Sequence, residues 1–415
     1  MLASIDRQRV NPSQSSVHHS TFSWPTVLIA TGAAVIPAMA ITMIGIILPE
    51  VRATFRLSEI QAGSLFSVIF IVAVATSATA GRLSDRIGRK RVLMTGIFSL
   101  SAGCTLSGLS WNYPLMLVLL STVGLGYGLI TPSTYALMSD LMPGRRGLAT
   151  ALVSVAFGTG GILGSTISSA LTARAGWRFA FFAVGGIGFL VALIQMLVIK
   201  GRAKSEAARR TLSLKHAIHR DLVLLALAEF SGASVFWSTA SWGPTVLRAT
   251  KAISIENTGV LMAIFGLAHM SGALLLGTLA DRFGRKPVIL WTAYPGALTV
   301  VIIYYLLGSM PALAIGFLFL GFFQGSVPSL VVALAQESAA PETVGTASGF
   351  VMSLHYVSAV ITPLVAAQLI ASTGNMLLSM GLASAVPFAV YGSLIAAVRA
   401  RSGGPAERVP PSRVG

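Results

Sequence analysis

The stretch Gly81-Arg-Leu-Ser-Asp-Arg-Ile-Gly-Arg-Lys-Arg-Val92 returns 196 residues later as Gly277-Thr-Leu-Ala-Asp-Arg-Phe-Gly-Arg-Lys-Pro-Val288, and eight of the twelve positions are identical. A second pair of segments repeats in the same way, with Pro143, Gly147 and Ala149 matched by Pro341, Gly345 and Ala347. The chain therefore consists of two similar halves. Internal duplication of this kind is common in proteins that span membranes.

Length and composition place this duplication in a bilayer. The 415 residues are 54% hydrophobic and 10% charged, with a mean hydropathy of +0.79, whereas soluble globular chains carry about 25% charged residues. Apolar runs long enough to cross a membrane recur from end to end. These values exclude an ordinary cytosolic enzyme and a disordered chain, and they predict an all-α polytopic membrane protein.

We expect twelve transmembrane helices, since a bilayer core of about 30 Å needs roughly 20 helical residues. They are predicted at 25–48, 60–80, 92–109, 114–138, 148–172, 178–199, 222–247, 257–277, 288–307, 311–335, 345–370 and 376–398. The longest polar interruption, 200–221, separates two six-helix bundles at 24–199 and 222–398. Tails are predicted at 1–23 and 399–415.

Topology, rather than nucleic-acid binding, explains the formal net charge of +16. Of the 29 lysines and arginines, 23 lie in the tails and loops on one side of the predicted spans and 6 lie on the other. The protein is expected in the cell membrane, and the positive-inside rule predicts that both termini and the 200–221 linker are cytoplasmic.

The repeated loop motif carries a resemblance to a known family. The pattern G-x-L-x-D-R-x-G-R-K between the second and third spans, echoed between the eighth and ninth, resembles the diagnostic motif of the major facilitator superfamily. The resemblance implies two six-helix bundles that rock about a central solute site. It further implies gating by the motif residues Gly81, Asp85, Arg86, Gly88, Arg89, Gly277, Asp281, Arg282, Gly284 and Arg285.

In the family, the acid of this motif helps to latch the two bundles together on the cytoplasmic side. A loop that only sets topology explains the cations, but it does not explain an acid at the same place in both copies. We therefore favour a latch at Asp85 and Asp281.

Two segments depart from the family pattern. The fifth span has Gly160-Gly161 where the antiporter signature has Gly-Pro, and Leu120 to Gly128 lacks the arginine often found in the fourth span. The first departure weakens the case for drug or metabolite export, and the second means that a proton-transfer or anion-binding role tied to that arginine cannot be carried over. The spacing of Gly160 and Gly164 predicts a close approach of two helix backbones.

Three ionisable side chains fall well inside predicted spans, where each costs about 2.5 to 3.5 kcal/mol even on the mildest scale. They are Glu229 in the seventh span, His269 in the eighth and His355 in the eleventh. Each is a candidate for proton coupling, because imidazole exchanges protons near neutral pH and a buried carboxyl can do the same. Two alternatives stay open: Glu229 as an interfacial residue that reaches water, and each histidine as a hydrogen bond between helices.

The resemblance also implies substrate contacts, because spans 1, 4, 7 and 10 line the cavity in the family. By position the candidates are Tyr135, Trp237, Gln324 and Trp242, although Trp242 is better explained as an interface anchor near a span end. Around His355, the residues Ser348, Ser358 and Thr362 share one helical face. We expect this face to point to a cavity or to a neighbouring helix.

No cofactor or metal is expected, since the sequence has no Walker motif, no cluster of histidines and carboxylates at metal spacing, and no nucleophile elbow. The predicted function is secondary active transport of a small organic solute by alternating access, coupled to protons. The expected partners of this monomer are the substrate, protons and the lipid bilayer. An uncoupled facilitator and a multidrug or metabolite efflux antiporter stay open as alternatives.

Overall fold

The computed structural model describes residues 24–142, 145–199, 219–339 and 343–399, and nearly all of them are helical. The first half contains α1 (Trp24–Phe55), α2 (Glu59–Ile87), α3 (Arg89–Ser107), α4 (Tyr113–Leu141), α5 (Arg146–Ala175) and α6 (Trp177–Val198). The second half contains α7 (Arg220–Lys251), α8 (Ile255–Phe283), α9 (Arg285–Val301), η3 (Ile302–Leu306), α10 (Met310–Gln324), α11 (Ser326–Ser338), α12 (Val344–Thr373), α13 (Met376–Met380), η4 (Gly381–Ala385) and α14 (Val386–Ala397).

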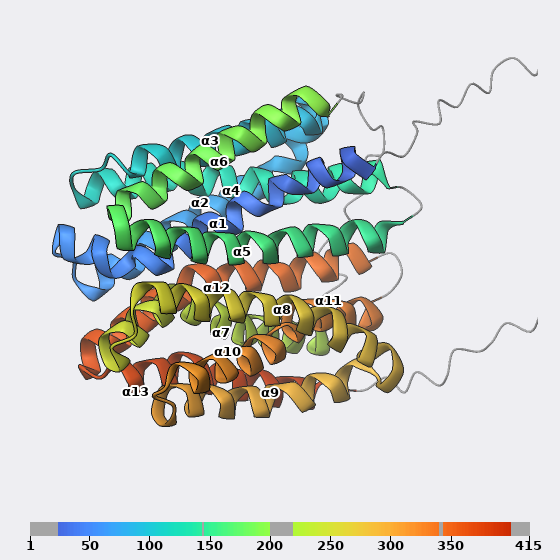
Figure 1. Ribbon diagram of the computed structural model, residues 1–415. Helices are drawn as coiled ribbons and strands as arrows, with labels where there is room; N and C mark the ends of the chain where they lie inside the picture. The colour runs from blue at the N-terminus through green and yellow to red at the C-terminus, as the bar shows by residue number, and fades with distance from the viewer. Residues whose placement is uncertain (1–23, 143–144, 200–218, 340–342, 400–415) are drawn as a thin grey trace, which may run out of the picture.

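These helices form two bundles side by side, α1–α6 in one and α7–α14 in the other (Figure 1). Within the described residues, eleven helical segments are long and apolar enough to cross a membrane. One of them, Met310–Ser338, joins α10 to α11, and another, Met376–Ala397, joins α13 through η4 to α14. The twelfth crossing is α3, whose first turn is cationic. The predicted all-α fold of two six-span bundles is therefore confirmed.

The glycine turns of the two motif copies lie on one face of the molecule. Gly88 links α2 to α3 with φ of 92°, and its counterpart Gly284 links α8 to α9 with φ of 89°. Only glycine adopts this conformation without strain, which explains why both copies of the motif keep it. The same face carries the start of α1 and the end of α14 (Figure 1). We call it the motif face.

Helix starts on the opposite face repeat between the halves as well. The Ser58 side chain caps α2 by accepting from the Gln61 backbone N–H, and Ser254 caps α8 in the same way. Capping satisfies backbone donors that the first helical turn leaves without partners. Because Ser58 and Ser254 are 196 residues apart, the duplication extends from the motif to the other end of these helices.

Close contacts join the two bundles in the half of the molecule away from the motif face. Glu50 of α1 forms an ion pair of 2.6 Å with Arg248 of α7. The Ser67 hydroxyl of α2 donates to the Val360 carbonyl of α12 at 2.6 Å. A Cβ on Gly63 would lie 2.7 Å from the Pro363 carbonyl oxygen, so α2 and α12 nearly touch there. We call these three contacts the interbundle seal.

Candidate site at the bundle interface

The structure brings together two of the three ionisable side chains predicted inside the spans. The Nδ1 atom of His355 lies 2.7 Å from Oε1 of Glu229, so a hydrogen-bonded pair joins α12 to α7. Glu229 is fully buried, whereas the His355 side chain is 16% exposed. The interpretation of Glu229 as an interfacial residue that reaches water is therefore wrong. His355 does form the expected hydrogen bond between helices, and its partner is the one buried carboxylate among the residues that the structure describes.

Hydroxyl groups hold α12 against α7 beside this pair. The Thr362 hydroxyl donates to Ser234 at 3.1 Å, and Ser358 lies 3.3 Å from Ser234. Ser358 and Thr362 belong to the polar face predicted around His355, and this face does meet a neighbouring helix. These bonds join the same two helices as the Glu229–His355 bond and, together with packing, fix the face of α12 that meets α7.

Aromatic rings surround the exposed side of the pair and cross the bundle interface. The Trp237 ring lies edge-on to His355 with centroids 5.7 Å apart, and it contacts Phe70 of α2 at 4.5 Å. Phe70 in turn meets Tyr127 of α4 at 5.4 Å. Edge-to-face geometry of this kind is the favoured packing of aromatic pairs. The Glu229–His355 pair thus borders a surface formed by both bundles.

His269 extends this aromatic surface along α8. Its ring lies 5.4 Å from Phe236 and 6.4 Å from Phe265, measured between centroids. The imidazoles of His269 and His355 are close enough to interact electrostatically. His269 forms no hydrogen bond with the residues that the structure describes, so it differs from His355 in having its nitrogens uncommitted.

The other predicted substrate contacts take different positions. Tyr135 is half-buried on α4, within electrostatic range of Tyr356 on α12. Gln324 is buried and its amide donates to the Gly232 carbonyl at 2.9 Å, which joins α10 to α7 inside one bundle. Trp242 is also fully buried and donates to the Pro363 carbonyl at 3.0 Å. The expectation that Trp242 is an interface anchor is wrong, because helix packing encloses the ring.

In both halves, the motif cations bind the ends of neighbouring helices. Arg89 pairs with Asp140 at the end of α4 and donates to the Ala136 carbonyl at 2.8 Å. Lys90 donates to the Met196 carbonyl of α6 at 2.9 Å. A cation beside the last carbonyls of a helix also opposes the negative end of its dipole. The loop therefore fastens α3 to α4 and α6.

The second copy of the motif makes the same kind of contact. Arg285 pairs with Glu337 of α11 and donates to the Ala333 carbonyl at 3.1 Å, and Lys286 donates to the Val398 carbonyl at 2.7 Å. The sequence reasoning missed Asp140 and Glu337 as partners. Their signal was available, since each acid closely precedes one of the two repeated prolines.

The structure does not test the roles predicted for the remaining motif residues. The side chain of Asp85 and the surroundings of Gly81 lie outside the described residues. Asp281 is exposed at the end of α8, and no hydrogen bond or ion pair joins it to another described residue. Arg86 and Arg282 are exposed as well. A latch by either acid stays a prediction.

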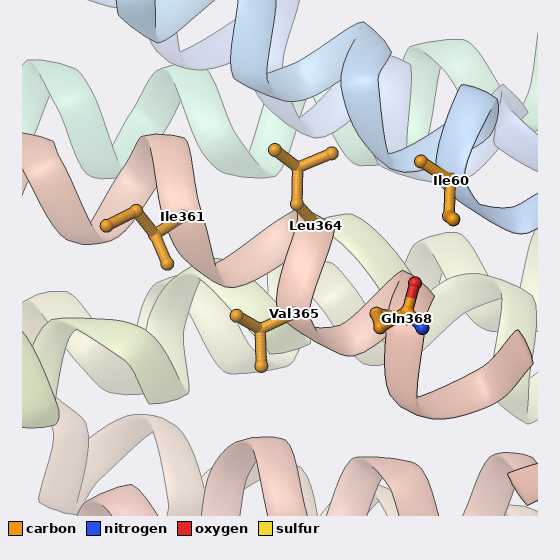
Figure 2. Close-up of a pocket in the computed structure, with 5 residues that line it drawn as sticks. All are labelled: Ile60, Ile361, Leu364, Val365 and Gln368. Carbon is orange, nitrogen blue, oxygen red and sulfur yellow. The ribbon is translucent and has the colours of Figure 1, made fainter. Parts of the chain in front are cut away.

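An apolar groove of about 350 Å³ lies between α2 and α12, away from this site. Figure 2 shows its lining residues Ile60, Ile361, Leu364, Val365 and Gln368. At 100° per residue, three of the four lining residues of α12, Ile361, Leu364 and Gln368, lie on the side of the helix turned away from His355. The groove therefore does not form part of the candidate site.

Comparison with known proteins identifies the family. The Major Facilitator Superfamily profile matches residues 30–363 and 225–414. The 3-(3-hydroxy-phenyl)propionate transporter of Escherichia coli K12 is 26% identical over 347 residues, which cover 80% of this chain and 83% of that protein. The gallate transporter of Pseudomonas putida is 22% identical over 410 residues, covering 90% and 89%.

Solved structures agree on the fold. A point mutant of the nucleoside transporter NupG superposes with a TM-score of 0.74 at 12% identity, covering 89% of this chain and 97% of that one. A D-xylose-proton symporter superposes with a TM-score of 0.70 at 18% identity, covering 89% and 94%. The resemblance read from the loop motif is thus confirmed, and this chain belongs to the Major Facilitator Superfamily as a multi-pass membrane transporter of small organic solutes rather than an enzyme.

Proposed function

We propose that this protein is a secondary active transporter of aromatic monocarboxylates, that protons drive it, and that the Glu229–His355 pair carries the proton. The observation that supports this best is the position of the pair. A fully buried carboxylate bonded to a half-buried imidazole lies next to aromatic rings from both bundles. An ionisable pair inside a membrane protein is costly to keep, which is the usual mark of a functional site.

The pair has the chemistry that proton coupling needs. Imidazole can accept and donate a proton, and the Nδ1 atom of His355 lies 2.7 Å from the Glu229 carboxylate, within hydrogen-bond distance. A proton can therefore pass between the two side chains across this one hydrogen bond. Gain or loss of a proton by the pair alters the net charge at the point where the bundles meet.

The names of the relatives support the substrate class. Three of them are transporters of 3-(3-hydroxy-phenyl)propionate, 4-hydroxybenzoate and gallate. Each of these molecules contains an aromatic ring, one carboxylate and at least one hydroxyl group. Phe70, Tyr127, Trp237 and Phe236 supply flat apolar surface suited to such a ring.

We propose that the interbundle seal opens and closes during alternating access. The positive-inside rule places the motif face in the cytoplasm, together with both termini and the 200–221 linker. The seal at Glu50–Arg248 would then lie toward the outside, which is the arrangement expected of a state that opens inward. Transport requires the seal to open while the bundles close at the motif face.

The test uses purified protein in proteoliposomes with a panel of aromatic acids headed by labelled 4-hydroxybenzoate. Glu229→Gln and His355→Gln should still exchange substrate down its own gradient, but they should not accumulate it under an imposed pH gradient. Glu256→Gln is the matched control, because Glu256 is an exposed acid in the first turn of α8. Accumulation by both pair variants at the wild-type level would contradict proton carriage by this pair. Wild-type equilibration without accumulation would instead identify an uncoupled facilitator.

A further inference from the structure

Two side chains next to the Glu229–His355 pair carry ring nitrogens with no partner among the described residues. Trp237 is only 3% exposed, and its buried Nε1 atom has no hydrogen-bond acceptor among the described residues. His269 likewise makes no hydrogen bond with the described part of the chain. A buried donor left unpaired costs free energy, and binding sites are where such donors persist.

These two donors lie on one continuous aromatic surface. Phe236 contacts Trp237 with ring centroids 5.0 Å apart and His269 with centroids 5.4 Å apart. Phe265 borders the same cluster, 5.8 Å from Phe236. The indole ring of Trp237 and the imidazole of His269 are therefore both next to one phenylalanine ring of α7. A flat molecule on this ring would have a donor available near its edge.

The charges around Trp237 and His269 indicate which chemical group these two donors would bind. The carboxylate of Glu229 is fully buried behind its bond to His355, so it does not offer a free acid at this surface. The described lysines and arginines lie at helix ends, away from the middle of the spans. N–H donors without a competing free acid favour an anion, and the absence of a fixed cation among the described residues of the site favours a single negative charge.

We propose that His269 and Trp237 form the carboxylate-recognition side of the substrate site and set the preference for acids over neutral analogues. This inference rests on the proposed function and assigns specificity to two residues that proton carriage does not use. His269 donates from one ring nitrogen, Trp237 donates from Nε1, and the Phe236 ring packs against the substrate ring. The carboxylate enters with a proton on the Glu229–His355 pair, so substrate and proton together add no net charge.

The experiment compares uptake of 4-hydroxybenzoate with uptake of its uncharged analogue 4-hydroxybenzamide. His269→Phe and Trp237→Phe remove a donor and keep an aromatic ring. For each variant we expect the KM for the acid to rise about 10-fold or more, because a hydrogen bond to a charged group is lost. The maximal rate should change by less than about 3-fold, and the preference for acid over amide should fall, because an N–H bond to the charged carboxylate is stronger than one to the neutral amide carbonyl.

Two further variants make the outcome specific. His269→Gln restores an N–H donor and should recover part of the acid preference. Leu267→Phe adds a ring on the exposed face of the same helix and should leave the preference unchanged. An unaltered KM and acid preference in both donor-removal variants would overturn the assignment.

Failure of this inference can be told apart from failure of the proposed function. Binding of 4-hydroxybenzoate to purified protein in detergent, followed by tryptophan fluorescence, needs neither a membrane nor a pH gradient. Wild-type binding that His269→Phe leaves intact would reject the role of His269 while aromatic-acid transport stands. No binding of any aromatic acid by wild-type protein would reject the substrate class, and with it this inference, while membership of the transporter family stands.

Discussion

At the scale of single residues, Glu229 and His355 are 126 positions apart in the sequence and 2.7 Å apart in space. The imidazole is the more exposed member, so it lies between the carboxylate and the bundle interface. The second carboxylate oxygen, Oε2, is buried and has no hydrogen-bond partner among the described residues. Glu229 therefore depends on His355 for much of its stabilisation, and the pair has a structural cost that transport assays alone do not reveal.

Truncation of His355 should destabilise the protein more than truncation of His269. His355→Ala leaves both oxygens of Glu229 without a protein partner in the described part of the chain, which costs about 1 to 3 kcal/mol. His269→Ala removes an imidazole of the same volume that makes no hydrogen bond to the described residues. Thermal unfolding of the two variants in the same detergent measures the difference. Equal decreases in melting temperature would show that the hydrogen bond contributes little.

At the scale of elements, small residues set how closely the helices pack. A side chain on Gly160 of α5 would overlap the Val35 carbonyl oxygen of α1, and one on Gly164 would overlap the Thr42 hydroxyl. The close approach predicted from their spacing is confirmed. Backbone atoms cannot move aside as a flexible side chain can, so Gly160 has no room for even one methyl group.

Gly160→Ala should therefore disrupt the α1–α5 contact, while its neighbour should tolerate the same change. Overpacking of this kind costs about 1 to 3 kcal/mol or more. A Cβ on Gly161 would lie 3.7 Å from the Thr42 methyl group, which is ordinary van der Waals contact. We expect Gly161→Ala to match wild type in melting temperature and in monodisperse yield after size exclusion. Similar yields and melting temperatures for both variants would contradict the packing argument.

At the scale of the whole molecule, contacts between the bundles are concentrated in the half away from the motif face. The ion pair Glu50–Arg248 is the charged member of the interbundle seal, and each side chain is about one quarter exposed. Half-buried pairs are screened less by salt than fully exposed ones. Breaking this pair should shift the population toward states in which the seal is open.

Glu50→Gln should make the seal open more often. A cysteine at Thr245, a buried position one turn from Arg248, reports on this opening when Cys104 is replaced by serine. Labelling by an impermeant maleimide from outside should be several-fold faster with Glu50→Gln. The charge-swapped double variant Glu50→Arg, Arg248→Glu should return labelling toward the slow wild-type rate. A labelling rate that neither variant changes would show that the pair does not hold the seal.

The orientation of the molecule is also testable with cysteines. On the Cys104-free background, a cysteine in the 200–221 linker should react with impermeant reagent only after the cells are opened. A cysteine at Trp111, an exposed residue between α3 and α4, should react in intact cells. Reaction of the linker from outside would reverse the topology that the positive-inside rule predicts.

The sequence by itself determined the twelve spans, the duplication, the family and the short set of ionisable residues inside the membrane. It could do so because a bilayer admits only segments that satisfy their own backbone hydrogen bonds, so apolar length and loop charge largely specify the architecture. The sequence also predicted tight turns at Gly88 and Gly284, and their positive φ angles explain why glycine is required there.

Only the tertiary structure decided which of those residues meet. Hydropathy places Glu229 and His355 at a depth in the membrane, but it does not state how far α7 and α12 rotate about their axes. That rotation comes from packing and from bonds such as Ser234–Thr362, which join residues 128 positions apart. The same limit explains why Trp242, near the end of its span, is enclosed by neighbouring helices and bonded to Pro363 instead of lying at the lipid interface.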